Sequence, residues 1–235
     1  MRVFDQSIKN TLALLSKYEA KPLSVSQDYP SEKEKVFVFN DEAKISLGDR
    51  SHPSSYLIAY TSDESLVKED ESFLIGEDIP SLKGGVPFAR IAFIRLEALD
   101  KKEQELYHLL RNIEYTRYHL NPKGYMLRVN TNELREGALI SEDALKKGFT
   151  FSSLSSLFLK AYKKQGVVKA VKQFFITDPS FDYSKLKELA KENEGIVVAL
   201  DHIMKKLKMD CNSCEFKGVC DEIDELRAIH QKEMK

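Results

Sequence analysis

The apolar residues of this chain change several times between the spacing of a helix and the alternation of a strand. Ile8, Leu12 and Leu15 recur at helical spacing, whereas the apolar runs at residues 56–60 and 88–96 are typical of strands. Because the two periods alternate along the chain, the sequence predicts an α+β domain in which helices flank a mixed, layered sheet.

The remaining elements follow from the same pattern and from turn residues. Ser141 is a plausible N-cap for a short helix that Gly148 ends, and the strand at residues 88–96 is long enough to be central. Gly84 and Gly85 mark a turn. Other predicted strands lie at residues 36–38, 73–75, 125–129 and 167–177, other predicted helices at residues 5–18, 101–117 and 153–164, and an acidic surface loop at residues 61–72.

The sequence beyond Pro179 looks helical, with a break at Gly195. We therefore expect an α/β domain at residues 1–180 and a helical tail at residues 181–235. A hydrophobic content of 42% is enough for a packed core, and a net charge of −1 argues against a nucleic-acid binder that relies on neutralising phosphates.

No apolar run reaches the length of a membrane-spanning helix. The first residues are interrupted by Asp5, Gln6, Lys9 and Asn10, which is not the pattern of a signal peptide. We therefore expect a cytoplasmic protein with no membrane partner, in which the cysteines are reduced.

All three cysteines, Cys211, Cys214 and Cys220, lie in one ten-residue stretch of the predicted tail. A Cys-x2-Cys pair places two thiolates on one turn, and Gly218 lets the loop to the third cysteine fold sharply. A disulfide framework would instead spread an even number of cysteines through a small secreted chain. The cluster predicts a metal or iron–sulfur site, and the alternative is three partly buried thiols that act as small apolar side chains.

A closed zinc site needs four ligands, and iron–sulfur clusters usually take four thiolates, so one ligand has to come from elsewhere. His230 is the first candidate, followed by Asp210, His202, a small molecule or a side chain of a partner. The competing interpretation is that His230 only borders the apolar helix face formed by Ile223 and Leu226.

Several motifs follow one another in a fixed order between about residues 65 and 180. They are Phe73–Ile79 with the strand Val86–Ile94, the helix Gln104–Tyr118 with the strand Leu127–Val129, the helix Ser141–Phe149, and the strand end Gln173–Asp178. In order and spacing these segments resemble the middle domain of the catalytic subunit of bacterial and archaeal CO dehydrogenase/acetyl-CoA synthase, the acetyl-CoA decarbonylase/synthase β-type subunit.

The chain departs from that family in three places. Residues 130–140 look like an insertion, and Arg117 stands where the family tends to have a tryptophan associated with coenzyme A. The cysteine pattern is shorter than the family's C-x2-C-x8-C-x9-C, and the later Cys-Gly-Cys is missing. The resemblance therefore implies a relative without the complete catalytic cysteine set.

What the resemblance implies is an accessory or stand-alone protein of CO and acetyl-CoA metabolism. Such a protein would bind an iron–sulfur cluster, or else zinc or nickel, and would dock a carbon monoxide dehydrogenase, a corrinoid protein or a ferredoxin. The alternative from another class is a non-redox scaffold whose cysteines hold structural zinc. A direct catalytic role is a third hypothesis, which predicts exchange between coenzyme A and acetyl-CoA.

The stretch between Ala144 and Thr177 contains seven lysines and no acidic residue. Such a patch suits the phosphates of coenzyme A or an acidic partner, although ordinary solvated helix faces have the same composition. The lysines that we expect to contact such a ligand are Lys160, Lys163, Lys164 and Lys169.

Overall fold

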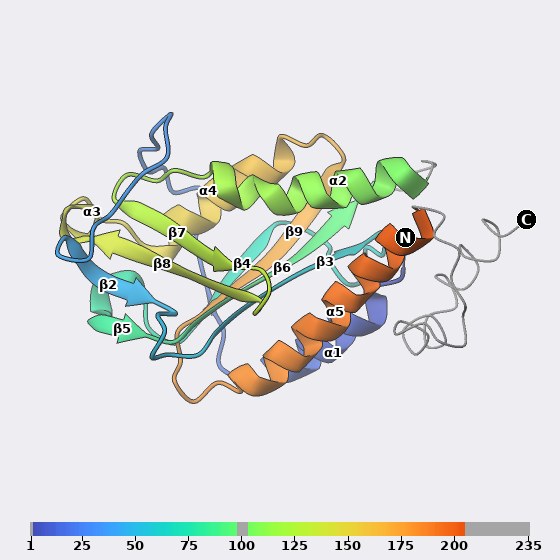
Figure 1. The fold of residues 1–235 in the computed structure, drawn as a ribbon, viewed down its shortest axis with the longest axis horizontal. Helices are drawn as coiled ribbons and strands as arrows, with labels where there is room; N and C mark the ends of the chain where they lie inside the picture. Colours follow the sequence, from blue (N-terminus) through green and yellow to red (C-terminus); the bar gives the residue numbers. More distant parts are fainter. Residues whose placement is uncertain (1, 98–102, 205–235) are drawn as a thin grey trace, which may run out of the picture.

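The computed structural model describes residues 2–97 and 103–204, and within them two mixed β-sheets are flanked by helices (Figure 1). The α+β class that the alternating periods predict is therefore confirmed. None of the helices in these two ranges is long and apolar enough to cross a membrane.

The larger sheet has five strands in the order β1-β4-β9-β6-β3. Strand β9 runs parallel to β4 and antiparallel to β6, and β6 runs parallel to β3. Its long strands are almost continuously apolar because both of their faces are covered. The bounds are β1 (Lys21–Pro22), β3 (Ser54–Thr61), β4 (Glu71–Ile75), β6 (Phe88–Leu96) and β9 (Val168–Ile176).

The smaller sheet has the order β5-β2-β8-β7 and contains the strands that the sequence pattern missed. Only β7 was predicted. Strand β8 occupies the stretch that resembles an insertion, where Glu136 and Gly137 interrupt the apolar alternation. Gly84 and Gly85, predicted as a turn, form an edge strand parallel to β2. The bounds are β2 (Ala43–Leu47), β5 (Gly84–Val86), β7 (Tyr125–Asn130) and β8 (Arg135–Ser141).

The strand predicted at residues 36–38 is wrong. The alternation that suggested it is real, because Val38 is buried while Phe37 is exposed. No described strand pairs with this segment through its backbone, and the Val38 N–H contacts only the sulfur of Met126 in β7, at 3.5 Å, so the segment remains irregular. A β-type pattern needs a neighbouring strand before it becomes a strand.

The helices agree with the predictions more closely. Ser141 caps α3, since its Oγ accepts a hydrogen bond from the backbone N–H of Ala144 at 3.2 Å. Thr150 caps α4 in the same way, through Ser153. The bounds are α1 (Asp5–Leu15), η1 (Ile79–Ser81), α2 (Glu103–Tyr115), η2 (Thr116–His119), α3 (Glu142–Lys146), α4 (Phe151–Lys163) and α5 (Tyr183–Met204).

Helix α5 runs through Gly195 without interruption, so the predicted break is wrong. One glycine costs a helix about 1 kcal/mol relative to alanine, and burial of neighbours such as Ile196 and Val197 outweighs that cost. The expected domain boundary at residue 180 lies in the turn before α5. From there α5 packs on β3, beside α1, so the described core continues to Leu200 (Figure 1).

Strand β3 lies at one end of the larger sheet, yet all eight of its residues are buried. Helix α5 covers it, and Asn193 donates from Nδ2 to the carbonyl oxygen of Ile58 at 2.8 Å. On the same edge, two residues earlier, the backbone N–H of Tyr56 donates to the carbonyl of Leu134. The outer edge of this long apolar strand is therefore not open to another chain.

The parallel strands β4 and β9 end together, and a glycine makes this possible. Gly76, directly after β4, has φ +106°, and a Cβ there would lie 2.5 Å from the backbone nitrogen of Asp178. Thr177 closes the contact by donating from Oγ1 to the carbonyl of Glu77 at 2.8 Å. A side chain at residue 76 would therefore strain the backbone and collide with the end of β9.

We predict that Gly76→Ala lowers the free energy of unfolding by roughly 1–3 kcal/mol more than Gly84→Ala. Gly84 also has a positive φ, of +65°, but nothing lies within 4 Å of the Cβ it would gain. Urea unfolding followed by circular dichroism measures both values. Equal losses would show that the approach of the two strand ends does not constrain residue 76.

Candidate functional site

The predicted metal ligands Cys211, Cys214, Cys220 and His230 lie outside the described residues. Within residues 2–97 and 103–204, no group of three or more histidines, cysteines, aspartates or glutamates is arranged to hold a metal ion. The metal site therefore stays a prediction from the sequence.

In the folded protein, the lysine-rich stretch between Ala144 and Thr177 does not form a purely basic surface. Its lysines pair with carboxylates from distant parts of the chain: Lys160 with Asp28, Lys163 with Asp70 at 3.1 Å, and Lys169 with Glu97 at 3.0 Å. Lys164 makes no ion pair with a described residue. The lysines outside the expected binding set, Lys146, Lys147 and Lys172, pair with Glu142, Asp143 and Glu71.

These ion pairs lie at the surface, where water and salt screen them, so each contributes little to stability. Lys160 holds the pKa of the Asp28 carboxyl below its usual value by a hydrogen bond and by its charge. An anionic ligand at these lysines would have to compete with the carboxylates that they already contact.

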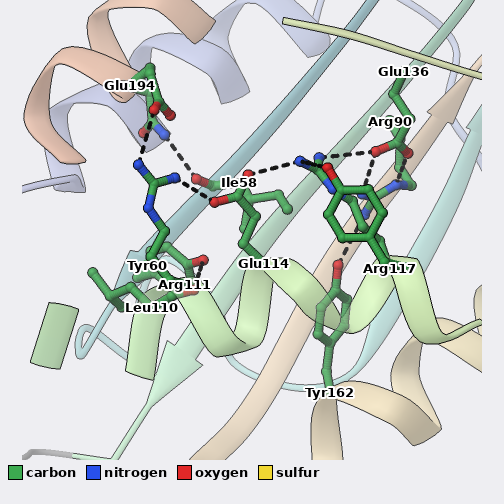
Figure 2. A network of polar contacts seen from close by, with 12 residues as sticks. Ile58, Tyr60, Arg90, Leu110, Arg111, Glu114, Arg117, Glu136, Tyr162 and Glu194 are labelled. Carbon is green, nitrogen blue, oxygen red and sulfur yellow. Dashed lines mark hydrogen bonds and ion pairs between the residues drawn. The ribbon is translucent and has the colours of Figure 1, made fainter. Parts of the chain in front are cut away.

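The most unusual polar feature of the described residues is a buried cluster that the sequence did not predict (Figure 2). Glu136 on β8 lies between two arginines, Arg90 on β6 and Arg117 on η2, and each of the three is at most 1% exposed. Arg90 donates from Nη2 to Glu136 Oε2 at 2.9 Å and contacts the other carboxylate oxygen through Nε. Arg117 donates from Nη1 to Oε2 at 3.2 Å.

Aromatic side chains complete the surroundings of the two guanidinium groups. The Arg90 guanidinium lies 4.2 Å from the ring centroid of Phe158 and donates from Nη1 to the hydroxyl of Tyr162 at 3.0 Å. The Arg117 guanidinium lies 4.0 Å from the centroid of the Tyr56 ring. Such cation–π contacts favour the charged arginines in a dry environment.

From Arg117 the contacts continue outward as a chain of alternating charges (Figure 2). Arg117 Nη2 donates to Glu114 at 2.8 Å, and Arg111 Nη1 donates to the other oxygen of Glu114 at 2.7 Å. Arg111 Nη2 then reaches Glu194 on α5 at 3.2 Å. The network thus runs from the interface of the two sheets, along α2, to the half-buried carboxylate of Glu194.

Three arginines and three glutamates make the network electrically neutral when all are ionised. Burial alone would raise the pKa of Glu136, but Arg90 and then Arg117 oppose it and hold that pKa below its usual value. At the other end burial dominates. It raises the pKa of Glu194, because Arg111 only partly compensates and Glu114 adds a second negative charge.

Two adjacent residues fasten α5 to three other elements. Glu194 contacts Arg111 on α2, while Asn193 donates to Ile58 of β3 and accepts a hydrogen bond from Ser7 of α1 at 3.3 Å. These buried polar contacts fix both the rotation and the axial position of the helix, because any slip would leave polar groups unpaired.

A cavity of about 20 Å³ lies beside the network, between α2, α5 and β3. Tyr56, Arg111, Glu114, Asn193 and Glu194 are among the side chains that line it. This volume holds about one water molecule. The cavity is therefore far too small for an organic ligand such as coenzyme A, and the network is a structural centre rather than a substrate pocket.

Sequence reasoning missed this cluster, although part of it was visible. Arg111, Glu114 and Arg117 follow one another at intervals of three residues, which places opposite charges on one face of the predicted helix. The partners Arg90 and Glu136 gave no such signal, because they lie on different strands, 46 positions apart in the sequence. Arg117 and residues 130–140, two of the three places where the sequence differs from the family that it was expected to resemble, meet at the Arg117–Glu136 contact.

Comparison of the chain with protein-family models and with curated proteins finds no match.

We predict that Glu136→Gln lowers the free energy of unfolding by about 3–5 kcal/mol, because two buried arginines lose their shared counter-charge. The matched control is Glu133→Gln, which changes the same charge at an exposed position of the same hairpin. Urea unfolding of both variants measures the difference. Similar stabilities would mean that the two arginines are neutralised in another way.

Glu194 generates a prediction about pH. Its pKa in the folded protein lies above the value of about 4.5 for an unperturbed glutamate, so the native protein loses stability as the pH rises through this range and the carboxylate becomes charged. Glu194→Gln cannot gain this charge. Measured from about pH 4 to about pH 7, the variant should therefore gain stability relative to the wild type.

The control for this measurement is Glu188→Gln on the same helix, at an exposed position whose carboxylate pairs with Lys185. A stability difference between Glu194→Gln and the wild type that stays constant across this pH range would contradict the raised pKa.

Proposed function

We propose that this protein is an accessory metal-binding protein of CO and acetyl-CoA metabolism, in which an α+β domain carries an iron–sulfur cluster at Cys211, Cys214 and Cys220 and docks a redox or corrinoid partner. The observation that carries the proposal is the confinement of every cysteine to one ten-residue stretch. Thiolates at such spacing converge on one metal centre. Reduced thiolates also fit a cytoplasmic protein.

The described residues favour separate roles for the folded core and for the metal site. Its core contains no cysteine, and its one extensive buried polar cluster is neutral and satisfied largely by its own residues. The packing of the described residues therefore does not depend on a cysteine. A cysteine cluster added to a core that is already complete is better explained by a function of the metal than by a need for folding.

Helix α5 is suited to carry such a segment. It is fastened through Asn193 and Glu194 to α1, β3 and α2, and the chain continues from its last residue, Met204, toward the cysteines. A firmly held helix gives a metal site a defined starting point relative to the domain.

For the partner, the exposed lysines remain the proposed contact surface. Lys160, Lys163 and Lys169 hold carboxylates by surface ion pairs that another acidic surface can replace at little cost. Lys164 makes no such pair among the described residues. This exchange suits transient docking of an acidic protein such as a ferredoxin, or of the phosphates of coenzyme A.

The second candidate function is a scaffold with structural zinc. It is favoured by one feature of the sequence, namely that three cysteines together with His230 make a Cys3His set, which zinc takes in closed structural sites. Fe–S clusters more often take four thiolates. The two candidates differ in the metal, its colour and its effect on folding.

We predict that protein purified without oxygen or added metal contains iron and sulfide and absorbs visible light. Cys214→Ser should remove both the iron and the colour, while the far-ultraviolet circular dichroism and the unfolding midpoint of the domain stay unchanged, because no cysteine lies in the described core. Ser213→Ala, next to the ligand, is the matched control and should keep the cluster.

About one colourless zinc per chain, lost in Cys214→Ser together with helical signal, would favour the scaffold instead. Wild-type protein that contains no metal under these conditions would refute both functions.

A further inference from the structure

Two half-buried arginines of the smaller sheet lack the carboxylate partners that other arginines of the described chain have. Arg128 on β7 and Arg135 on β8 make no ion pair with any described residue. The arginines that do pair with a glutamate are Arg90, Arg95, Arg111 and Arg117. A cation that is partly withdrawn from water normally has a counter-charge, because the loss of hydration has to be offset.

Both unpaired arginines project from the face of the smaller sheet that points away from the larger sheet. Side chains alternate along a strand. Glu136 of β8 points toward Arg90 in the larger sheet. Its neighbours Arg135 and Gly137 therefore point the other way. Arg128 pairs with Gly137 across the ladder, so it shares this outer face and is a diagonal neighbour of Arg135.

The two guanidinium groups are held in different ways. Arg135 donates from Nη2 to the backbone carbonyls of Asp49 at 2.6 Å and His52 at 2.9 Å, in the loop after β2. Arg128 reaches across β8 and donates from Nη2 to Ser46 Oγ on β2 at 2.8 Å. Most of the five N–H donors of Arg128 have no described acceptor. The hydroxyl hydrogen of Ser46 likewise donates to no described residue.

The charges that act on Arg128 leave an excess of positive charge. Burial lowers the pKa of the Arg128 guanidinium, Asp49 opposes this, and the charge of Arg135 adds to it. Asp49 is itself engaged, because its Oδ1 accepts a hydrogen bond from the Ser51 N–H and contacts His52 Nδ1, each at 2.8 Å. Two arginines and one carboxylate thus carry a net charge of +1, next to hydrogen-bond donors that have no acceptor.

We propose that Arg128 and Ser46, with the charge of Arg135 beside them, bind a phosphate group on the outer face of the smaller sheet. A guanidinium group binds two phosphate oxygens at once, and the Ser46 hydroxyl can donate to a third oxygen. A carboxylate has two oxygens, which the guanidinium alone would satisfy, so the additional hydroxyl donor favours phosphate. The bound anion supplies the counter-charge that the two arginines lack.

The first test is isothermal titration of the full-length protein with inorganic phosphate at constant ionic strength, which should show saturable binding. Arg128→Gln should raise the phosphate dissociation constant by about tenfold or more, because it removes the charged donor. Its circular dichroism should stay unchanged, since the Arg128 side chain hydrogen-bonds only to Ser46 among the described residues. Ser46→Ala is a smaller change and should raise the constant by about threefold or more.

Two control variants separate this site from other basic groups. Arg50→Gln removes an arginine at an exposed position of the loop that contains Asp49. Lys164→Gln removes one of the exposed lysines that are proposed to contact a partner. Both variants should bind phosphate as the wild type does. Binding that is lost in Lys164→Gln but kept in Arg128→Gln would overturn this site and place the phosphate on the lysines instead.

A second probe, adenosine 5′-monophosphate, identifies the source of the phosphate. Tighter binding of the nucleotide than of inorganic phosphate, lost in Arg128→Gln, would identify an organic phosphate ester as the ligand. Equal or weaker binding of the nucleotide would identify free phosphate. Acetate that displaces phosphate with equal affinity would overturn the choice of phosphate over a carboxylate.

A wild-type protein with no saturable phosphate binding would overturn the proposal, as would a folded Arg128→Gln variant with wild-type affinity. The residues tested, Arg128 and Ser46, belong to the described domain and not to the cysteine segment. Metal content is measured independently, so the proposed function stands or falls separately.

Discussion

The contact on which the rest of this fold depends is the carboxylate of Glu136 between the guanidinium groups of Arg90 and Arg117. It joins β6 of the larger sheet, β8 of the smaller sheet and the turn after α2, at a point where none of the three side chains reaches water. Buried ion pairs add little net stability, but removal of one partner leaves an uncompensated charge at high cost. The arrangement of the two sheets that brings all three charges together is therefore favoured over any that separates them.

Apolar runs made the larger sheet predictable, whereas the smaller sheet was mostly hidden. Residues 88–96 are a long, nearly continuous apolar stretch, and residues 167–177 are mostly apolar, as is typical of buried strands. Strand β8 contains Glu136 and Gly137, and each is explained by a residue in another element. Glu136 is the partner of Arg90. Gly137 lacks a Cβ that would lie 2.3 Å from the carbonyl oxygen of Leu47. No local sequence pattern predicts a residue whose partner lies 46 positions away.

The sequence also could not predict which charged side chains pair with each other when the partners are far apart in the chain. The lysines between Ala144 and Thr177 form an uninterrupted basic stretch along the chain, yet Asp28, Asp70 and Glu97 meet them from segments far away in the sequence. Conversely, the helical spacing of Arg111, Glu114 and Arg117 was visible in advance, because those partners lie on one helix face. The cysteine cluster could be interpreted from spacing alone, since metal ligation by Cys-x2-Cys is a local property, but its fourth ligand and its metal could not.

The covering of β3 by α5 has a practical consequence for anyone who divides this protein into parts. Tyr183–Met204 follows the predicted domain boundary and looks like the beginning of a separate tail, but this helix shields the outer edge of an eight-residue apolar strand. A chain ended before Tyr183 would present that edge to its neighbours, and edges of this kind pair with one another and aggregate. Removal of the cysteine segment for study therefore has to begin after Met204, because the domain and its last helix fold as one unit.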